Sequence, residues 1–245
     1  MKITAAYLMI GDEILSGRVA DANLNFLATE LTQMGIILKE VRVVGDEESE
    51  IISALDTLRA KYDYVFTSGG VGPTHDDITT LSVANALGKE LYLNEQAVLL
   101  LEQYYGKGNL NDARTKMAKI PVGADIIDND VMAVGGFYIN NIFVMAGVPK
   151  IFKSMFLAIK NQLRVGDKIR SMELNLTAKE SLIAHDFAEL QKQYPEVSMG
   201  SYPNDQGTSL VFRSSDYEKL EKSFLEMKKI LEKNEEDLII DCSNI

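Results

Sequence analysis

A glycine-rich segment followed by two carboxylates carries the strongest chemical signal in the chain; we call Ser68–Asp77 the glycine loop. Its three glycines, Gly69, Gly70 and Gly72, allow positive φ values and a close approach of the backbone to a ligand. A helix is predicted directly after the loop, and its free amides and positive dipole end favour an anion. The sequence therefore predicts a phosphate-binding loop.

The two acids at the end of this loop, Asp76 and Asp77, would repel a bound phosphate. A divalent cation held by hard oxygen ligands between carboxylate and phosphate would remove that conflict. Ser68 and Thr74 carry hydroxyls that can donate to phosphate oxygens. Alternatively, the glycines only make a tight turn and Asp77 only caps the helix, since both are common between a strand and a helix.

Acidic residues also follow the two earlier predicted strands. Gly11, Asp12 and Glu13 come after an apolar run at 3–10, and Glu13 is a candidate for holding the cation or for activating a water molecule. Asp46 follows the next strand, where it could accept hydrogen bonds from ribose hydroxyls or cap the following helix. The alternative is that Asp12 and Glu13 only end their strand, because polar loop residues usually need no function.

Strands and helices alternate in the first part of the chain. Apolar runs of strand length at 3–10, 36–44 and 63–67 are separated by segments whose apolar residues recur every three or four positions. The helical residues are Leu24, Leu27, Leu31 and Met34, then Ile51, Leu55 and Leu58. This alternation predicts an α/β fold, a mostly parallel sheet with helices on both faces. Ligands bind such sheets outside the carboxyl ends of the strands, so the three loops should share one edge.

The elements predicted between residues 88 and 164 are shorter. They are a strand at 90–93, helices at 94–105 and 113–119, a β-hairpin turning at Asn140-Asn141, and a helix at 150–163. A boundary near 164–168 gives an α/β domain at 1–166 and a small α+β domain at 167–245. The second domain is expected to run strand, helix, two strands and a charged helix at 216–233, with its helices on one face.

Composition limits the classes of partner. The chain has 245 residues, a formal net charge of −11 and a pI near 4.8, which argues against nucleic acid and anionic membranes. The second domain also lacks a Gly-x-x-Gly motif. No stretch approaches 18 consecutive apolar residues, and the amino terminus opens into a strand-like run, so we expect a cytoplasmic protein.

Cysteine and histidine are too few for several kinds of site. Cys242 is the only cysteine, which excludes an internal disulfide and a cysteine-based metal site within the chain. The two histidines, His75 and His185, make a histidine-rich zinc site unexpected. His75 lies within the glycine loop and is a candidate for anion contact or proton transfer, whereas His185 is expected to be structural.

The residues of the glycine loop also resemble a known family. The run Ser-Gly-Gly-Val-Gly-Pro-Thr-His-Asp-Asp-Ile-Thr at 68–79 looks like the signature of the CinA (competence/damage-inducible protein A) family. Further matching pieces stand in the same order at Gly11–Gly17, Asp21–Asn23 and Val44–Asp46. The amino-terminal domain of that family is similar to molybdopterin-binding domains of the MogA and MoaB type. The resemblance covers roughly residues 3–90.

The resemblance implies a metal-dependent pyrophosphatase that hydrolyses the diphosphate of ADP-ribose or of a similar dinucleotide such as FAD. Asp77 and Glu13 are then the catalytic residues and hold a divalent ion, Mg, Mn or Co. The ligand, a phosphorylated nucleotide-like molecule, would be bound by Gly11, Asp12, Asn23, Asp46, Ser68, Gly69, Gly70, Gly72, Thr74 and Asp76. The resemblance also implies a homodimer, and a second domain that is either of the KH type or a split βαβ module. A module that binds molybdopterin or a nucleotide without turnover, and molybdopterin adenylylation, stay open as alternatives.

Two segments depart from the family pattern. The usual Gly-Thr-Ala-Pro-Gly-Phe run reads Met-Ala-Val-Gly-Gly-Phe at 132–137 here. The usual Leu-Pro-Gly-Val-Pro-x-Glu-Met run reads Met-Ala-Gly-Val-Pro-Lys-Ile-Phe at 145–152, so Ile151 replaces an acidic residue. If that acid helps to bind metal or substrate in relatives, this protein differs in activity or preference. No segment resembles the amidohydrolase domain of full-length CinA proteins, so deamidation of nicotinamide mononucleotide is not expected.

Overall fold

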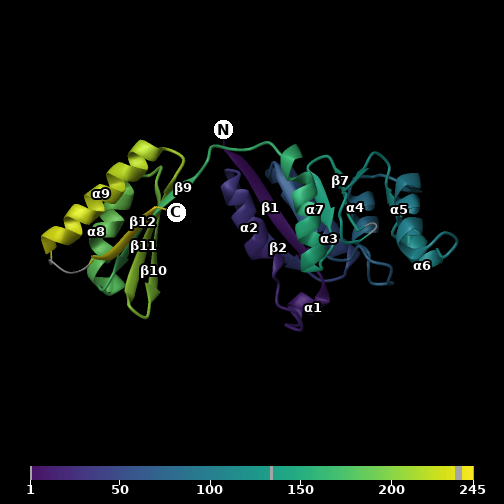
Figure 1. The fold of residues 1–245 in the computed structure, drawn as a ribbon, viewed down its shortest axis with the longest axis horizontal. Helices are drawn as coiled ribbons and strands as arrows, with labels where there is room; N and C mark the ends of the chain where they lie inside the picture. The colour runs from purple at the N-terminus through teal and green to yellow at the C-terminus, as the bar shows by residue number, and fades with distance from the viewer. Residues whose placement is uncertain (1, 133–134, 235–238, 245) are drawn as a thin grey trace. The chain divides into compact units, whose positions relative to one another are not determined.

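The computed structural model describes residues 2–132, 135–234 and 239–244. The chain divides into two compact units, Met1–Gly166 and Asp167–Ile245 (Figure 1). Each unit has its own hydrophobic core. No helix within the described ranges has both the length and the apolar character needed to cross a membrane.

A six-stranded sheet in the order β2-β1-β3-β8-β7-β6 forms the centre of the first unit. Its strands are β1 (Ile3–Ile10), β2 (Ile36–Val44), β3 (Tyr64–Ser68), β6 (Asp125–Ile126), β7 (Phe137–Ile139) and β8 (Ile142–Met145). The neighbours β2, β1, β3 and β8 are parallel, whereas β7 is antiparallel to both β8 and β6. The predicted α/β class with a mostly parallel sheet is confirmed.

Helices cover both faces of this sheet because successive side chains of β1 point in opposite directions. The covering helices are α2 (Asn23–Gln33), α3 (Glu48–Lys61), α4 (Thr79–Ala86) and α7 (Pro149–Ile159). Tyr7 and Met9 pack in a cluster with α2 and α7, whereas Leu8 and Ile10 pack in a second cluster with α3 and α4. The apolar helix faces predicted from the sequence are buried in these two layers.

The hairpin predicted around Asn140-Asn141 is present between β7 and β8. Asn140 has a φ of 54°, the left-handed conformation that asparagine tolerates better than most residues. The sequence predicts the first strand of this hairpin at 133–139, and residues 133–134 of that range lie outside the described residues. The predicted helix at 150–163 forms as α7, and a short 3₁₀ turn, η1 (Lys160–Gln162), follows it.

Residues 91–121 form a small lobe, which we call the α5–α6 lobe. It contains β4 (Leu91–Leu93), α5 (Glu95–Tyr105), α6 (Asp112–Lys116) and β5 (Lys119–Pro121). The helix predicted at 113–119 was therefore too long. Its last residue, Lys119, instead begins β5 and pairs antiparallel with Leu93 of β4. Ala97, Leu101 and Met117 are buried between the elements of the lobe.

The second unit is an antiparallel sheet in the order β10-β11-β9-β12, packed against two helices. Its elements are β9 (Arg170–Leu176), α8 (Glu180–Gln193), β10 (Ser198–Asn204), β11 (Gly207–Ser214), α9 (Tyr217–Asn234) and β12 (Ile239–Asn244). The predicted order of elements is correct but omits β12. That strand has only two leading apolar residues and is defined by its pairing with β9, which local periodicity does not reveal.

Candidate functional site

The loops that carry the predicted site residues meet at one edge of the first unit's sheet. Strand order reverses at β1, since β2 lies on one side of it and β3 on the other. Figure 1 shows the short helix α1 (Asp12–Leu15) at the lower end of β1, where the chain leaves the sheet. This carboxyl edge, at a change of strand order, is where open α/β sheets bind ligands.

The loop after β1, which we call the acidic loop (Gly11–Gly17), is tied to the loop after β2. The amide of Gly11 donates to the carbonyl oxygen of Val44 at 3.0 Å. The amide of Asp12 donates to Oδ2 of Asp46 at 3.0 Å, and the amide of Asp46 donates back to Oδ1 of Asp12 at 3.3 Å. These reciprocal bonds hold the two loops side by side.

Close backbone packing holds the glycine loop against β1. Gly69 has a φ of 100°, and a Cβ atom at this position would overlap the carbonyl oxygen of Ile10. The amide of Gly69 donates to the carbonyl oxygen of Met145 at 3.2 Å. This amide is therefore already bonded to protein and is not free for a phosphate, so Gly69 contributes backbone placement.

Thr79, at the start of α4, clamps the same loop from the other side. Its hydroxyl donates to the carbonyl oxygen of Gly69 at 2.8 Å, and its amide donates to that of Gly70 at 3.0 Å. In the part of the chain that the structure describes, no acceptor takes the amides of Gly70, Val71 and Gly72. Three successive amides thus remain available to an anion.

A buried polar network lies beneath the glycine loop. The hydroxyls of Tyr7 and Ser68 are 2.6 Å apart, and burial raises the pKa of Tyr7 even though the Ser68 bond lowers it. Asn23, only 2% exposed, donates its Nδ2 to the carbonyl oxygen of Gly147 at 2.8 Å. Gly147 in turn packs against Gly69. Ser68 and Asn23 therefore support the loop from below, and the sequence had not singled out Tyr7 or Gly147.

Carboxylates of the site lie over glycines. A Cβ atom at Gly72 would come within 2.7 Å of Asp77 Oδ2, and one at Gly45 within 2.5 Å of Asp12 Oδ1. The carboxylate of Glu13 occupies the corresponding space at Gly11. These three glycines leave room for acidic side chains, a role different from the approach of a ligand to the backbone.

Four carboxylates from the three loops share one electrostatic environment. Burial is the main cause that raises the pKa of Asp46, and the negative charges of Asp12, Glu13 and Asp76 raise it further. The hydrogen bond from the Asp12 amide opposes this effect. The structure therefore brings Asp12, Glu13, Asp46 and Asp76 together, and a cationic group near them would relieve their repulsion.

Asp77 is held within the glycine loop itself. Its Oδ2 accepts hydrogen bonds from the amide of Thr74 at 2.8 Å and from the hydroxyl of Thr74 at 2.5 Å. Thr74 also lowers the pKa of Asp76, and the charges of His75 and Lys116 contribute to this lowering. Thr74 thus orients the acidic end of the loop.

The described residues contain no group of three or more His, Cys, Asp and Glu side chains that could hold a metal ion. A cation at this edge would therefore need ligands beyond the protein. Mg²⁺ often binds through one or two carboxylates, water and substrate phosphates. The donor set of carboxylate oxygens beside free amides fits such an ion only together with a phosphate-bearing ligand.

Two basic side chains lie at the glycine loop, one within the loop and one from a distant segment. His75 is 99% exposed, and its Nδ1 lies 3.8 Å from Asp76 Oδ1. Lys116, from α6 in the α5–α6 lobe, donates its Nζ to the carbonyl oxygen of Thr74. The sequence analysis missed Lys116, because it is 42 residues from Thr74 and lies in a weakly patterned segment.

Ile151, which stands where the family pattern has an acid, packs partly buried against the core between α2, α7 and the sheet. Its side chain takes part in apolar packing near the start of α7. This position supplies no charge to the carboxyl edge of the sheet.

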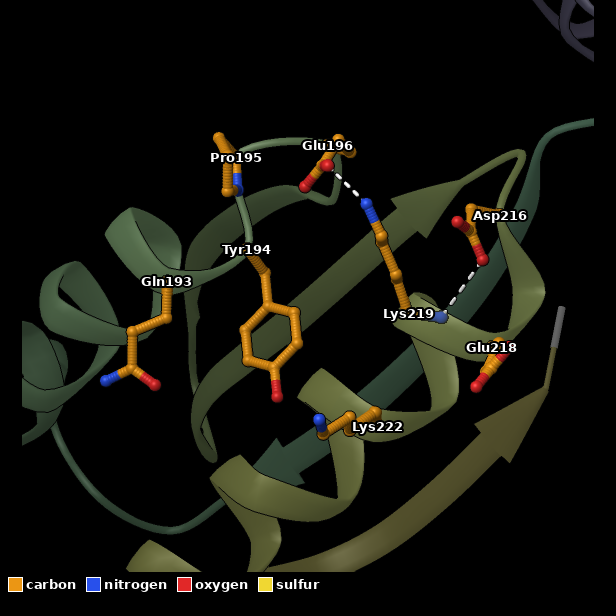
Figure 2. A pocket seen from close by; sticks show the side chains of 8 residues that line it. All are labelled: Gln193, Tyr194, Pro195, Glu196, Asp216, Glu218, Lys219 and Lys222. Carbon is orange, nitrogen blue, oxygen red and sulfur yellow. Dashed lines mark hydrogen bonds and ion pairs between the residues drawn. The ribbon is translucent and has the colours of Figure 1, made fainter.

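A hollow of about 480 Å³ belongs to the second unit and contains none of the predicted site residues (Figure 2). It is lined by Gln193, Tyr194, Pro195, Glu196, Asp216, Glu218, Lys219 and Lys222. Lys219 forms an ion pair with Glu196, and its amide donates to Asp216 Oδ1 at 3.1 Å (Figure 2). These contacts hold the start of α9 in place, so the polar residues that line the hollow have a structural role.

Comparison with known proteins agrees with this architecture. Residues 6–164 match the family model described as "Probable molybdopterin binding domain", and residues 168–238 match "FAD synthase, middle domain". A protein of Pyrococcus furiosus, Protein PF0476, is 35% identical over 242 residues, which cover 91% of this chain and 95% of that protein.

Two further relatives carry more descriptive names. A protein of Caenorhabditis briggsae described as "Probable FAD synthase" is 32% identical over 259 residues, covering 93% of this chain but 49% of that protein. This chain thus spans about half of that relative. The crystal structure of CinA from Thermoplasma acidophilum, a protein of unknown function, has 32% sequence identity and a TM-score of 0.63, covering 66% of this chain and 98% of that one. The chain belongs to the CinA family, with the molybdopterin-binding type of domain at residues 6–164.

Proposed function

We propose that the first unit hydrolyses the diphosphate bond of ADP-ribose or of a related dinucleotide such as FAD. The observation that carries this proposal is the run of free amides at Gly70, Val71 and Gly72, in a loop that ends in two acids. Amides bind phosphate oxygens, and carboxylates activate water, so this pairing supports the proposal. The similarity to FAD synthases supports a flavin dinucleotide among the substrates.

The side chains would divide the work. Thr74 fixes the Asp77 carboxylate before a ligand arrives, so little ordering is left for the reaction. Glu13, on the exposed acidic loop, would accept a proton from the attacking water. The water oxygen would bond to phosphorus as the bridging P–O bond breaks, and the leaving phosphate would take up a proton. ADP-ribose would give AMP and ribose 5-phosphate, and FAD would give AMP and FMN.

The proposal includes a divalent ion, Mg²⁺, Mn²⁺ or Co²⁺, held by Asp77 and Glu13 together with phosphate oxygens of the ligand. When bound, such an ion would polarise the phosphorus centre and lower the pKa of a bound water. The hard carboxylate oxygens next to a phosphate-binding loop support this assignment.

The first test is release of AMP from ADP-ribose and FAD by the purified protein, with each of the three metals. Asp77→Asn should reduce kcat by at least about 100-fold, because asparagine keeps an acceptor for Thr74 but loses the charge. Glu50→Gln, an exposed acid on α3, is a matched control that should leave kcat unchanged. If the protein released no AMP with any metal, or if Asp77→Asn matched the wild type, we would abandon the proposal.

A second candidate is a module that binds molybdopterin or a nucleotide without turnover. Ile151 packs in the apolar core at a position where the family pattern has an acidic residue, and this difference favours the binding module. It would show saturable binding by calorimetry with no product, whereas molybdopterin adenylylation would consume ATP when the pterin is present. The homodimer is also part of our proposal, and light scattering of the purified protein tests it.

A further inference from the structure

Lys116 is the basic side chain that bridges the α5–α6 lobe to the glycine loop. Its Nζ donates to the carbonyl oxygen of Thr74, the same residue whose amide and hydroxyl hold Asp77. Lys116 as a residue is partly buried, and its bond to Thr74 lies at the exposed surface. An ammonium has three donors, and one bond to Thr74 leaves two of them for a ligand.

The charge of Lys116 is not neutralised by a carboxylate in direct contact. Among the described residues, no acid lies close enough to Lys116 to form an ion pair. Its field nevertheless acts on the acidic end of the loop, where it helps to lower the pKa of Asp76. A cation therefore already stands beside the loop that carries the free amides.

The acids near the glycine loop make the positive charge of Lys116 important for phosphate binding. Asp12, Glu13, Asp46 and Asp76 share one field, and a phosphate brought to Gly70–Gly72 would be repelled by them. The described residues offer no group of three ligands that would hold a metal before the substrate arrives. A protein-borne positive charge would therefore strengthen the attraction of the free amides for phosphate without depending on a bound metal.

We propose that Lys116 is a phosphate-binding residue of this site and that it gives the protein affinity for nucleoside diphosphates in the absence of metal. The inference rests on the phosphate site of the proposed function but is independent of catalysis. Lys116 would donate to a diphosphate oxygen while it keeps its bond to Thr74, so ligand binding would also join the α5–α6 lobe to the glycine loop.

Calorimetric titration of ADP into the full chain, with EDTA present, tests this inference. The wild type should bind ADP, and Lys116→Met should raise Kd at least tenfold because it keeps the length of the side chain but removes the charge. Lys116→Arg should stay within about threefold of the wild type, since a guanidinium also donates to phosphate. Lys119→Met, an exposed lysine on β5 of the same lobe, is the matched control and should bind like the wild type.

A thermal melt of each variant separates a loss of binding from a loss of folding, and Lys116→Gln, which also removes the charge and should also raise Kd at least tenfold, retains the test if Lys116→Met is unstable. Equal Kd values for the wild type and Lys116→Met would overturn the inference. Binding of ADP by the wild type only when Mg²⁺ is added would also overturn it, while leaving the proposed hydrolysis intact. Conversely, Lys116-dependent binding without any release of AMP from ADP-ribose would support the inference and reject the hydrolysis.

Discussion

The glycine loop and the acidic loop lie at the same edge of the sheet but are held by different means. Buried backbone contacts fix the glycine loop: Gly69 against Ile10, and the Thr79 hydroxyl on the Gly69 carbonyl. The acidic loop is mostly exposed, and its ties to the neighbouring loop are the bonds between Asp12 and Asp46 and the Gly11 amide. The start of the glycine loop is thus tied to the folded core, although residues 73–76 are exposed, whereas the acidic loop lies almost entirely on the surface.

This difference would suit two tasks of the proposed phosphate site. Amides that bind phosphate must hold fixed positions, because a shift of the backbone would misplace all of them at once. Carboxylates that meet a cation or water can adjust through their side chains at little cost to the fold. Substitutions under the glycine loop should therefore reduce stability, whereas substitutions in the acidic loop should alter ligand chemistry and leave stability nearly unchanged.

The largest expected effect is that of Gly69→Ala. An alanine there would adopt an unfavourable positive φ and overlap the Ile10 carbonyl oxygen, so we expect a loss of more than about 3 kcal/mol in the free energy of unfolding. Gly17→Ala in the acidic loop is the matched control. Gly17 has a φ of 71° with no atom within 4 Å of an added Cβ, so only strain of about 1 kcal/mol is expected. Equal losses in urea denaturation would remove the distinction between the two loops.

A smaller effect is expected at the network beneath the glycine loop. Tyr7→Phe and Ser68→Ala each remove one partner of a buried hydrogen bond and should cost about 1 kcal/mol. Because the two hydroxyls bond to each other, the double variant should lose less than the sum of the single losses. Tyr104→Phe, which changes an exposed side chain of α5, is the control and should leave the free energy of unfolding unchanged. Additive losses in a double-mutant cycle would show that the two hydroxyls are not coupled.

Local patterns were sufficient to predict the frame of the first unit. The spacing of Leu24, Leu27 and Leu31 predicted α2, and Asn140 predicted the hairpin turn, because burial on one helix face and a positive φ both leave marks on neighbouring residues. Strand β12 left no such mark, since it is defined by its partner β9. Periodicity reports what one segment buries, not which distant segment pairs with it.

The glycines show the same limit within the site. The sequence predicted that Gly69 offers its amide to phosphate, but that amide is bonded to Met145, and the glycine is needed because Ile10 lies so close. Gly72 leaves space for the carboxylate of Asp77. A glycine-rich loop thus indicates that other atoms lie close to its backbone. Whether those atoms belong to a ligand or to the protein depends on residues that lie elsewhere in the chain. Local sequence patterns could not predict the contact of Lys116 with Thr74 for the same reason.

The smallest expected effect concerns the acidic loop's neighbour, Asp46, and depends on pH. Burial and nearby acids raise the pKa of Asp46 above its ordinary value of 3.8, so the native state holds its proton more tightly than the unfolded chain does. Stability contributed by this group is present at low pH and is lost as pH rises through the folded pKa. At pH 7 the negative charge of Asp46 therefore destabilises the folded state, and Asp46→Asn should stabilise the protein by less than about 1 kcal/mol.

That gain should shrink as the pH falls toward 4 and vanish below the ordinary pKa, where Asp46 is neutral in both states. Asp112→Asn, in the exposed first turn of α6, is the control with the opposite sign, because its charge is favourable at a helix start. Thermal melts from pH 3 to pH 7 compare the two variants with the wild type. A gain for Asp46→Asn that did not vary with pH would mean that packing, not the shared field of the carboxylates, sets the cost at this position. The acidic loop and its neighbour would then be arranged by sterics, as the glycine loop is.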